Sequence, residues 1–413
     1  MRILIHGINY APELTGIGKY TGEMAEWLAA RGHDVHVLTA APYYPEWQVH
    51  TDYRGKNWHT EVLRGVHVHR VPLYVPKEVT SIKRIIHEFS FLAATIPFWI
   101  KALFSKKFDL VFCIAPPFHL SSFPWLYAGI RKTVWINHIQ DLQVDAAKDL
   151  GMIKNQTFLR AMFGLERFFL NKGARVATIS EGMQKKILSK GIVPKKLLFF
   201  PNWVDGNAIQ PLTKEQSLRA EMGFSIHDKI VLYSGNLGEK QGLDSIIRVA
   251  AQFNDDSAVK FVICGSGGGK DKLVKLASES ALSNVYFFPL QPYDKLSALL
   301  AMADVHLVLQ KSSAADLVMP SKLTGILASG GCALVTASEG TTLFDVVQKF
   351  NMGILVDPES DSALEQGIKT ALFTDVSLLR QNARQYAQQY LEKEEILQSF
   401  ENEVMELVKK SLS

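Results

Sequence analysis

Short runs of β-branched and other apolar residues alternate with longer amphipathic segments along the whole chain of 413 residues. Such alternation is typical of a parallel sheet whose strands are connected by helices, so the fold class is α/β. The first half predicts strands at Ile3–His6, Val35–Thr39, Val66–Val71, Leu110–Ile114, Thr133–Asn137, Arg175–Ile179 and Leu197–Phe200. The second half predicts strands at Ile230–Tyr233, Lys260–Cys264, Val285–Phe288, Val305–Leu309, Ala333–Thr336 and Gly353–Val356.

A turn cluster at Pro201–Asp205 interrupts this pattern and is followed by a polar stretch without periodicity. We place the domain boundary there, with an N-terminal domain of residues 1–204 and a C-terminal domain of residues 205–390. The chain is also longer than a single hydrophobic core usually supports. Apolar residues at helical spacing continue over Leu378–Val408, and we expect residues 391–413 to form a helix that packs back toward the N-terminal domain.

Composition excludes several classes of protein. Hydrophobic residues make up 47% of the chain and charged residues 21%, as in ordinary soluble globular proteins. The 45 basic residues barely outnumber the 41 acidic ones, which disfavours nucleic acid as a partner. Cys113, Cys264 and Cys332 lie far apart, so neither a disulfide framework nor a zinc site is predicted, and a cytoplasmic location is expected.

The longest apolar stretch, Phe89–Phe104, is shorter than the roughly 20 residues that span a bilayer and contains Pro97 and Lys101. Basic residues lie on both sides of it. This pattern fits a helix that lies on an anionic membrane surface, and it fits equally well a buried helix of the domain.

Glycines follow the first predicted strand within Thr15–Tyr20 (TGIGKY), at the start of a helix. Gly16 and Gly18 would let backbone N–H groups approach an anion, although a tight turn between strand and helix is the alternative interpretation. The loop departs from the dinucleotide fingerprint because Thr21 occupies the last glycine position, and the second strand ends without an acidic residue for a ribose. A nicotinamide enzyme is therefore disfavoured.

Three loops of the C-terminal domain carry residues that suit a nucleoside diphosphate. Cys264–Lys270 (CGSGGGK) ends a strand and opens a helix, but its glycine spacing is too short for a P-loop and Asp271 replaces the residue that would hold magnesium. Pro320–Leu323 (PSKL) places a serine, a lysine and free amide groups at a helix N-terminus. Ser234–Gly242 contributes Lys240. Ordinary helix caps and solvated lysines are the alternatives.

In this order, these motifs resemble the retaining glycosyltransferases of family 4, and among them the WcaI-type colanic acid glycosyltransferases. The resemblance covers nearly the whole chain and rests on GINYAPELTGIGKYTGEMAEWLAARGHDV near the N-terminus, APYYPEW (41–47), HIQDLQVDA (138–146), TISEGM (178–183), FFPNWVD (199–205), YSGNLGEKQGLD (233–244) and MPSKLTGILASGG (319–331). It implies the GT-B fold, in which two Rossmann-like domains face each other across a cleft. It also implies a nucleotide sugar donor held mainly by the C-terminal domain, an acceptor held mainly by the N-terminal domain, and no metal or other cofactor.

Carried over by position, the resemblance implies that the donor is bound by Gly16, Gly18, Asn236, Lys240, Gly265, Gly267, Leu290, Ser321, Lys322 and Leu323. Ser321–Leu323 would meet the diphosphate with help from Lys240, and Leu290 would contact the base through its backbone. Asn236 stands where many members have an arginine, and Gln241 is an alternative to Lys240 as the aligned partner. Less positive charge is then available for the leaving group than is usual in the family.

Asp141 and Asp316 are the candidate catalytic carboxylates. Many family members carry a Glu-x7-Glu motif whose equivalent positions here are Leu317 and Gly325, so Asp316 is the nearest carboxylate for the sugar hydroxyls. We find no replacement for the second glutamate. Asp141 follows a strand, at the edge where open α/β sheets bind ligands, and a helix cap is the alternative. Gln140 stands where members often have a histidine.

The resemblance suggests transfer of fucose from GDP-fucose, with retention, onto a polyprenyl-diphosphate-linked glycan in exopolysaccharide assembly. The enzyme would act at the inner face of the plasma membrane, where Phe98, Trp99 and Lys101 are expected to meet the membrane or the acceptor. The missing glutamates motivate a rival interpretation, a sugar-nucleotide-binding scaffold without catalysis. A nicotinamide oxidoreductase, and a phosphorylase or epimerase of the same fold, have less support in the sequence.

Overall fold

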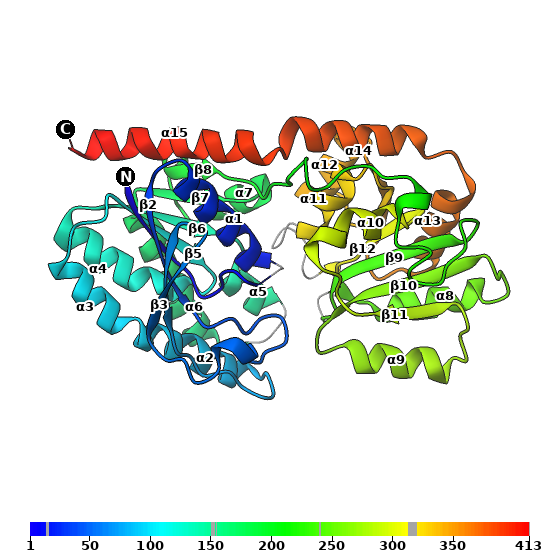
Figure 1. The fold of residues 1–413 in the computed structure, drawn as a ribbon, viewed down its shortest axis with the longest axis horizontal. Coiled ribbons are helices and arrows are strands. Elements are labelled where there is room, and N and C mark those ends of the chain that lie inside the picture. Colours follow the sequence, from blue (N-terminus) through cyan, green and yellow to red (C-terminus); the bar gives the residue numbers. More distant parts are fainter. Residues whose placement is uncertain (14–15, 150–152, 154, 239–240, 313–319, 413) are drawn as a thin grey trace. The chain divides into compact units, whose positions relative to one another are not determined.

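The computed structural model describes residues 1–413 apart from 14–15, 150–152, 154, 239–240, 313–319 and 413 (Figure 1). The chain forms two compact units, each with its own sheet and surrounding helices. Unit 1 consists of Met1–Pro201 and Glu395–Ser413, and unit 2 consists of Asn202–Glu394. Both units are α/β domains, the class that the sequence predicts.

The sheet of unit 1 has the strand order β3-β4-β2-β1-β5-β6-β7-β8 in the described part of the chain. The strands are β1 (Arg2–His6), β2 (Asp34–Ala40), β3 (His59–Leu63), β4 (Val66–Val71), β5 (Leu110–Ala115), β6 (Val134–Ile139), β7 (Arg175–Thr178) and β8 (Leu197–Phe199). The pairings are parallel except between β3 and β4. The sequence missed β3, because this edge strand exposes part of its surface and lacks a continuous apolar run.

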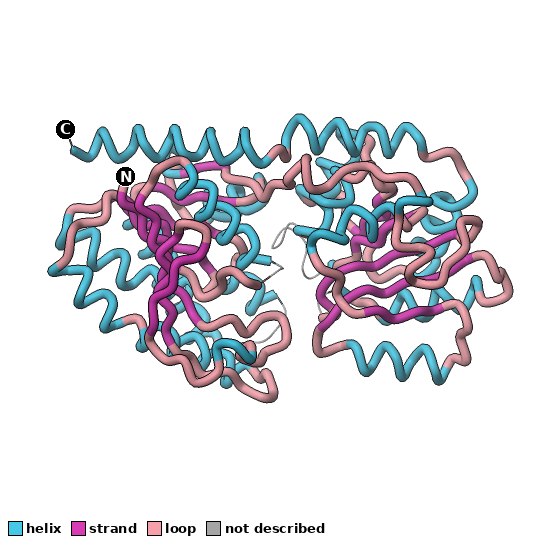
Figure 2. Tube along the Cα trace, viewed as in Figure 1, coloured by secondary structure: helices cyan, strands magenta, loops and turns pink. Residues whose placement is uncertain are grey.

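Helices cover both faces of this sheet (Figure 2). Val111 and Cys113 of β5 pack into a core with Trp99 and Tyr127, whereas Phe112 between them packs against Phe400. This alternation is expected, because successive strand residues point to opposite faces. The helices of unit 1 are α1 (Gly16–Ala30), α2 (Ser81–Ala94), α3 (Ile96–Phe104), α4 (Ser122–Arg131), α5 (Gln143–Asp149), α6 (Gln156–Lys172), α7 (Glu181–Ser189) and α15 (Lys393–Leu412).

The apolar stretch Phe89–Phe104 is divided between two helices. Helix α2 ends at Ala94, Thr95 follows as its cap, and α3 begins at Ile96 with Pro97 in its first turn. Proline is tolerated there because the first N–H groups of a helix have no partner within that helix. None of the described helices is both long enough and apolar enough to cross a bilayer.

The sheet of unit 2 is parallel, with the strand order β11-β10-β9-β12-β13-β14 in the described residues. Its strands are β9 (Lys229–Asn236), β10 (Val259–Ser266), β11 (Val285–Phe288), β12 (Val305–Val308), β13 (Ala333–Thr336) and β14 (Ile354–Val356). Its helices are α8 (Asp244–Ala250), α9 (Lys270–Glu279), α10 (Leu296–Ala301), α11 (Ser321–Ala328), α12 (Thr342–Phe350), α13 (Asp361–Phe373) and α14 (Ser377–Tyr390). The strand order changes direction between β9 and β12, and ligands of open α/β sheets bind at such a switch point.

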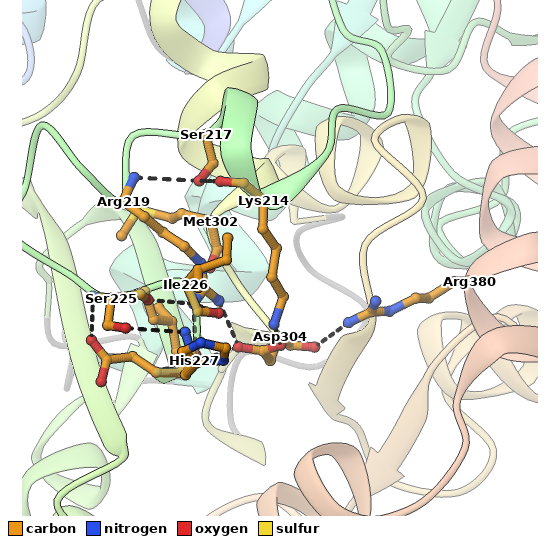
Figure 3. Close-up of polar contacts among 11 residues, drawn as sticks. Lys214, Ser217, Arg219, Ser225, Ile226, His227, Met302, Asp304 and Arg380 are labelled. Carbon is orange, nitrogen blue, oxygen red and sulfur yellow. Dashed lines mark hydrogen bonds and ion pairs between the residues drawn. The ribbon is translucent and has the colours of Figure 1, made fainter.

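The polar stretch after the turn cluster is held to the sheet of unit 2 by Arg219 and Asp304 (Figure 3). Arg219 is buried and donates to one carboxylate oxygen of Asp304 (2.8 Å) and to the carbonyls of Ser225, Ile226, Asp228 and Met302. The other oxygen of Asp304 pairs with Lys214 at 2.6 Å. Polar contacts thus anchor this stretch to the sheet, beside the buried side chains of Leu218 and Phe224.

Candidate functional site

In unit 2, a lysine with a buried ammonium group lies beside the carboxyl end of β9. Lys322 follows Ser321 at the start of α11, and its Nζ lies 3.5 Å from the centroid of the Tyr233 ring. This Nζ has no hydrogen-bond partner among the described residues, and burial lowers the pKa of Lys322 to about 7. Because a buried charge without a partner is costly, an anion that reached this ammonium would be bound favourably.

Two glycine loops beside Lys322 pack backbone against backbone. A Cβ on Gly265 would overlap the carbonyl oxygen of Gly235, and one on Gly267 would lie 2.8 Å from the amide nitrogen of Leu237. The amide of Leu237 donates to Ser266 (2.8 Å). The predicted glycines Gly265 and Gly267 are therefore required for the close approach of the loops after β9 and β10, whatever they contact in a ligand.

A pocket of about 190 Å³ opens at the carboxyl ends of β9, β12 and β13. Its lining includes polar groups from all three strand ends, among them Gln241, Gln310, Lys311 and Thr336. The hydroxyl of Thr336 accepts from the amide of Gln310 at 2.8 Å and donates to its carbonyl at 2.9 Å, which fixes the end of β12. The pocket thus lies at the switch point of this sheet, where a ligand is expected.

The other donor-binding predictions in unit 2 fall in different surroundings. Ser321 and Asn236 are exposed, and Leu290 is half-buried in the loop after β11. Leu323 points into the core, and its N–H donates to the carbonyl of Pro320 (3.0 Å), so it offers packing rather than a free amide. Lys240 and Asp316 lie outside the described residues.

In unit 1, the loop after β1 is organised around Glu13, which the sequence did not single out. Its carboxylate accepts hydrogen bonds from the backbone N–H groups of Tyr43 (3.2 Å) and Tyr44 (3.1 Å) and from the side chain of Asn9 (3.0 Å). Burial raises the pKa of Glu13 to about 7. A Cβ on Gly18 would lie 2.7 Å from this carboxylate. A single acidic residue in a loop gives no sequence signal for such contacts.

Gly16 and Gly18 are glycines for different physical reasons. Gly16 has a φ of +59°, a conformation that favours glycine, and a Cβ there would meet none of the described atoms within 4 Å. Gly18 has no positive φ but has no room for a side chain beside Glu13. The predicted glycine loop thus combines a conformational requirement with a packing requirement at the start of α1.

Asp141 lies between β6 and α5, at the same edge of the sheet as the loop after β1, and is half-buried. Next to it, Gln140 is hydrogen-bonded to the ring of His138 at 2.7 Å. Burial lowers the pKa of His138 to about 3, so this ring is neutral and belongs to the interior of the unit. Asp141 is the charged group that the end of β6 presents.

The structure corrects the expectation for Trp99. This side chain is 4% exposed and packs edge-on against His6, with ring centroids 5.3 Å apart, in the core of unit 1. It cannot meet a membrane or an acceptor, because its position on α3 faces the sheet. Phe98 is half-buried against His69, and Lys101 is exposed. The apolar residues that α3 does expose are Ile96, Ile100 and Phe104, spaced four residues apart on one face.

Two family models match the chain. The one described as a glycosyl transferase 4-like domain matches residues 15–203, and the one described as glycosyl transferases group 1 matches residues 214–390. The chain is also 43% identical, over 412 residues, to the Escherichia coli (strain K12) protein WcaI, whose name assigns it to the glycosyl transferases of colanic acid biosynthesis. That alignment covers 98% of this chain and 100% of WcaI.

Solved glycosyltransferase structures share the fold. Sucrose-phosphate synthase from Thermosynechococcus elongatus superposes with a TM-score of 0.78 at 17% identity, covering 99% of each chain. The Anabaena protein HepE, solved in complex with UDP and glucose, gives a TM-score of 0.73 at 16% identity, covering 98% of this chain and 100% of HepE. The solved structures show the GT-B fold. The full-length relative and the two family models show that the chain belongs to the group 1 glycosyltransferases, and that its first half is a glycosyl transferase 4-like domain.

Proposed function

We propose that this glycosyltransferase moves a sugar from a nucleoside diphosphate sugar to a lipid-linked acceptor, and that Lys322 neutralises the departing diphosphate. The observation that carries the proposal is the buried Nζ of Lys322, which lacks a hydrogen-bond partner in the described part of the chain. As the glycosyl–phosphate bond lengthens, negative charge develops on the diphosphate. A preorganised cation shielded from water lowers the barrier to that step. Ser321, Asn236, Lys240 and the glycine loops would complete the donor site.

The test compares Lys322→Met with Lys260→Met. Both lysines lie near a tyrosine ring in unit 2, but Lys260 is on β10 beside Tyr286, with its Nζ 5.8 Å from the ring centroid. We expect Lys322→Met to abolish the rise in thermal stability caused by a nucleotide sugar and to lower kcat/KM on the order of 100-fold. Lys260→Met should leave both unchanged. Equal donor binding by the folded Lys322→Met protein would exclude the diphosphate assignment.

The donor that we propose is GDP-fucose, transferred with retention and without a metal ion. The likeness to WcaI supports a role in colanic acid synthesis, and HepE shows that a protein of this fold binds UDP and glucose. In the presence of a chelator, we expect GDP-fucose to raise the melting temperature more than UDP-glucose does. A larger rise in melting temperature with UDP-glucose would contradict the assignment of GDP-fucose and favour UDP-glucose as the donor. Turnover that required added magnesium would contradict the metal-free mechanism.

The acceptor that we propose is a polyprenyl-diphosphate-linked glycan of exopolysaccharide assembly. Asp141, at the carboxyl edge of the sheet of unit 1, would accept a hydrogen bond from the acceptor hydroxyl, and Asp316 would contact hydroxyls of the transferred sugar. Asp141→Asn should lower transfer while the donor still raises the melting temperature. Binding of the donor without transfer by the wild-type chain, with any lipid-linked acceptor, would favour the scaffold interpretation instead.

An exposed apolar surface on unit 1 supports peripheral binding to the membrane that holds such an acceptor. Helix α3 contacts both α2 and α4, and Figure 1 shows α3 and α4 side by side. Their exposed apolar side chains, which we call the apolar helix surface, are Ile96, Ile100, Phe104, Trp125, Leu126 and Ile130. Phe104 is 87% exposed. Large exposed apolar side chains on two neighbouring helices are the kind of feature that supports a site of interaction.

The charges around the apolar helix surface favour an anionic bilayer over other partners. Lys101 and Lys106 are exposed, and neither α3 nor α4 contains an acidic residue. Each basic residue near an anionic lipid surface contributes about 1 kcal/mol to binding. We expect Ile100→Ser with Phe104→Ser to lower binding to vesicles rich in phosphatidylglycerol at least about 10-fold. The matched control is Leu378→Ser, at an exposed leucine of unit 2. If the double variant bound vesicles as well as the wild type does, the apolar helix surface would be excluded as the membrane-binding site.

A further inference from the structure

Two loops at the carboxyl edge of the sheet of unit 1 are joined by a buried carboxylate. Glu13, in the loop after β1, is 6% exposed. One of its oxygens accepts from the backbone N–H groups of Tyr43 (3.2 Å) and Tyr44 (3.1 Å) in the loop after β2, and the other accepts from Asn9 (3.0 Å). No ion pair neutralises Glu13 within the described residues. The carboxylate is therefore stabilised by hydrogen bonds to three N–H groups.

The same carboxylate determines how closely α1 approaches the loop. A Cβ on Gly18 would lie 2.7 Å from the carboxylate and 2.9 Å from the Cβ of Glu13, and one on Gly22, a turn later, would lie 3.1 Å from the Cβ of Ala11. Two small residues on one face of α1 thus allow the helix to rest on the loop. The position of Glu13 therefore determines where the first turn of α1 lies.

The stems of these loops are anchored without Glu13. Arg70 of β4 is buried and donates to the carbonyls of Ala40 (3.0 Å) and Ala11 (2.6 Å), and its Nε pairs with Glu61. The amide of Ala40 also donates to the carbonyl of Ile8 at 3.3 Å. Arg70 therefore fixes the points at which the loops after β1 and β2 leave the sheet. Glu13 fixes the parts of these loops that lie farther from the sheet. A buried carboxylate costs more than an uncharged group would, so a contribution to stability does not account for it.

We propose that Glu13 is a positioning residue for glycosyl transfer, acting through the first turn of α1 and the Tyr43–Tyr44 backbone. This rests on the proposed function, which assigns the carboxyl edge of the sheet of unit 1 to the acceptor. The carboxylate does not itself touch the substrates. Displacing a binding loop by about 1 Å can cost on the order of 100-fold in rate, because reacting groups lose their alignment.

Protonation of Glu13 supplies a readout that a purely structural role would not give. Burial raises the pKa of Glu13 to about 7, and the charged or titratable groups that face it are Arg70 of β4 and Tyr43 and Tyr44 of the loop after β2. Below this pKa the carboxyl group is neutral, so its hydrogen bonds to the N–H groups of Tyr43 and Tyr44 weaken and an O–H takes the place of one acceptor oxygen. Transfer at saturating donor should therefore decline as the pH falls through about 7.

The experiment measures kcat and KM against pH for the wild type, Glu13→Ala, Glu13→Gln and a control, Glu26→Gln. Glu26 is on α1 but pairs with Arg64 near the surface. We expect Glu13→Ala to lower kcat by roughly 10- to 100-fold with a smaller change in KM. Glu13→Gln has a single acceptor oxygen, like the protonated carboxyl group, so its kcat should match the low-pH value of the wild type at every pH and show no decline near pH 7. Glu26→Gln should behave as the wild type.

Wild-type kcat in folded Glu13→Ala, or an unchanged decline in Glu13→Gln, would overturn the proposal. If the wild type transfers no sugar from any donor, the proposed function fails instead. In that case, amide hydrogen exchange at Tyr43 and Tyr44 still tests the positioning. Exchange should speed up below about pH 7 in the wild type, beyond the intrinsic pH effect, and not in Glu13→Gln. Equal exchange behaviour of the wild type and Glu13→Gln would exclude the positioning role of Glu13.

Discussion

The ammonium of Lys322 lies over the face of the Tyr233 ring, 3.5 Å from the ring centroid. Gly235 permits this arrangement, because a Cβ there would lie 3.2 Å from both Cε and Nζ of the lysine. A tyrosine face attracts a cation but does not accept a hydrogen bond as a carboxylate would. The lysine is therefore held in place without a carboxylate partner among the described residues, so the charge that it carries when protonated is available to a ligand.

The affinity for a nucleoside diphosphate should fall as the pH rises above about 7. Burial lowers the pKa of Lys322 from 10.5 to about 7, so above that pH the unliganded side chain is neutral and must take up a proton to pair with an anion. The loss should approach ten-fold per pH unit. Calorimetry in buffers of different ionisation enthalpy would measure the proton uptake. Affinity that is independent of pH, or proton uptake that persists in Lys322→Met, would contradict this assignment.

The lowered pKa of Lys322 also makes stability depend on pH, but stability should rise with pH where ligand affinity falls. Between about pH 7 and 10.5 the unfolded chain binds a proton that the unliganded folded state does not bind. Stability from this group therefore rises with pH across that window. Comparison of unfolding curves for the wild type and Lys322→Met would reveal the difference. A wild-type protein that gained no stability relative to Lys322→Met across this window would contradict the depressed pKa.

Packing of the two glycine loops in unit 2 should be intolerant of a single methyl group. A Cβ on Gly265 would overlap the carbonyl of Gly235, whereas one on Gly268, in the same loop, would meet none of the described atoms within 4 Å. We expect Gly265→Ala to lower the free energy of unfolding by about 2 kcal/mol or more and to weaken donor binding. Gly268→Ala should stay within about 0.5 kcal/mol of the wild type. Equal denaturant midpoints for the two variants would argue against this packing.

Apolar runs predict buried strands such as β5 and β6 because both faces of these strands are covered. They do not predict β3, where Val62 is exposed and pairing occurs on one side only. The place of Lys322 at a helix start leads to the prediction that it binds an anion. Its burial against Tyr233 is not, because those residues are brought together only by the fold. Glu13 is hidden for the same reason, since its partners are backbone N–H groups of the loop after β2.

Two aromatic residues of helix α3 should differ sharply in what they contribute to stability. Trp99 is 4% exposed in the core, whereas Phe104 is 87% exposed on the same helix. Trp99→Ala should lower the free energy of unfolding by about 3–5 kcal/mol, because it removes a large buried side chain. Phe104→Ala should change it by no more than about 0.5 kcal/mol. Denaturant titration of both variants measures the contrast, and a stable Trp99→Ala protein would place this ring outside the core.

Two arginine–aspartate pairs of unit 2 should differ sharply in what they contribute to stability. Arg219 and Asp304 are largely buried and joined to several backbone groups (Figure 3), whereas Arg248 and Asp361 form an exposed pair at 2.6 Å. In Arg219→Met, Lys214 is the partner that remains for the Asp304 carboxylate in ion pairs among the described residues, and the carbonyls that Arg219 had held are freed. Removing one partner of a buried pair typically costs about 3–5 kcal/mol, and an exposed pair contributes at most about 1 kcal/mol. Urea unfolding of Arg219→Met and Arg248→Met should therefore give widely separated midpoints. Similar midpoints would mean that Arg219 does not anchor the polar stretch.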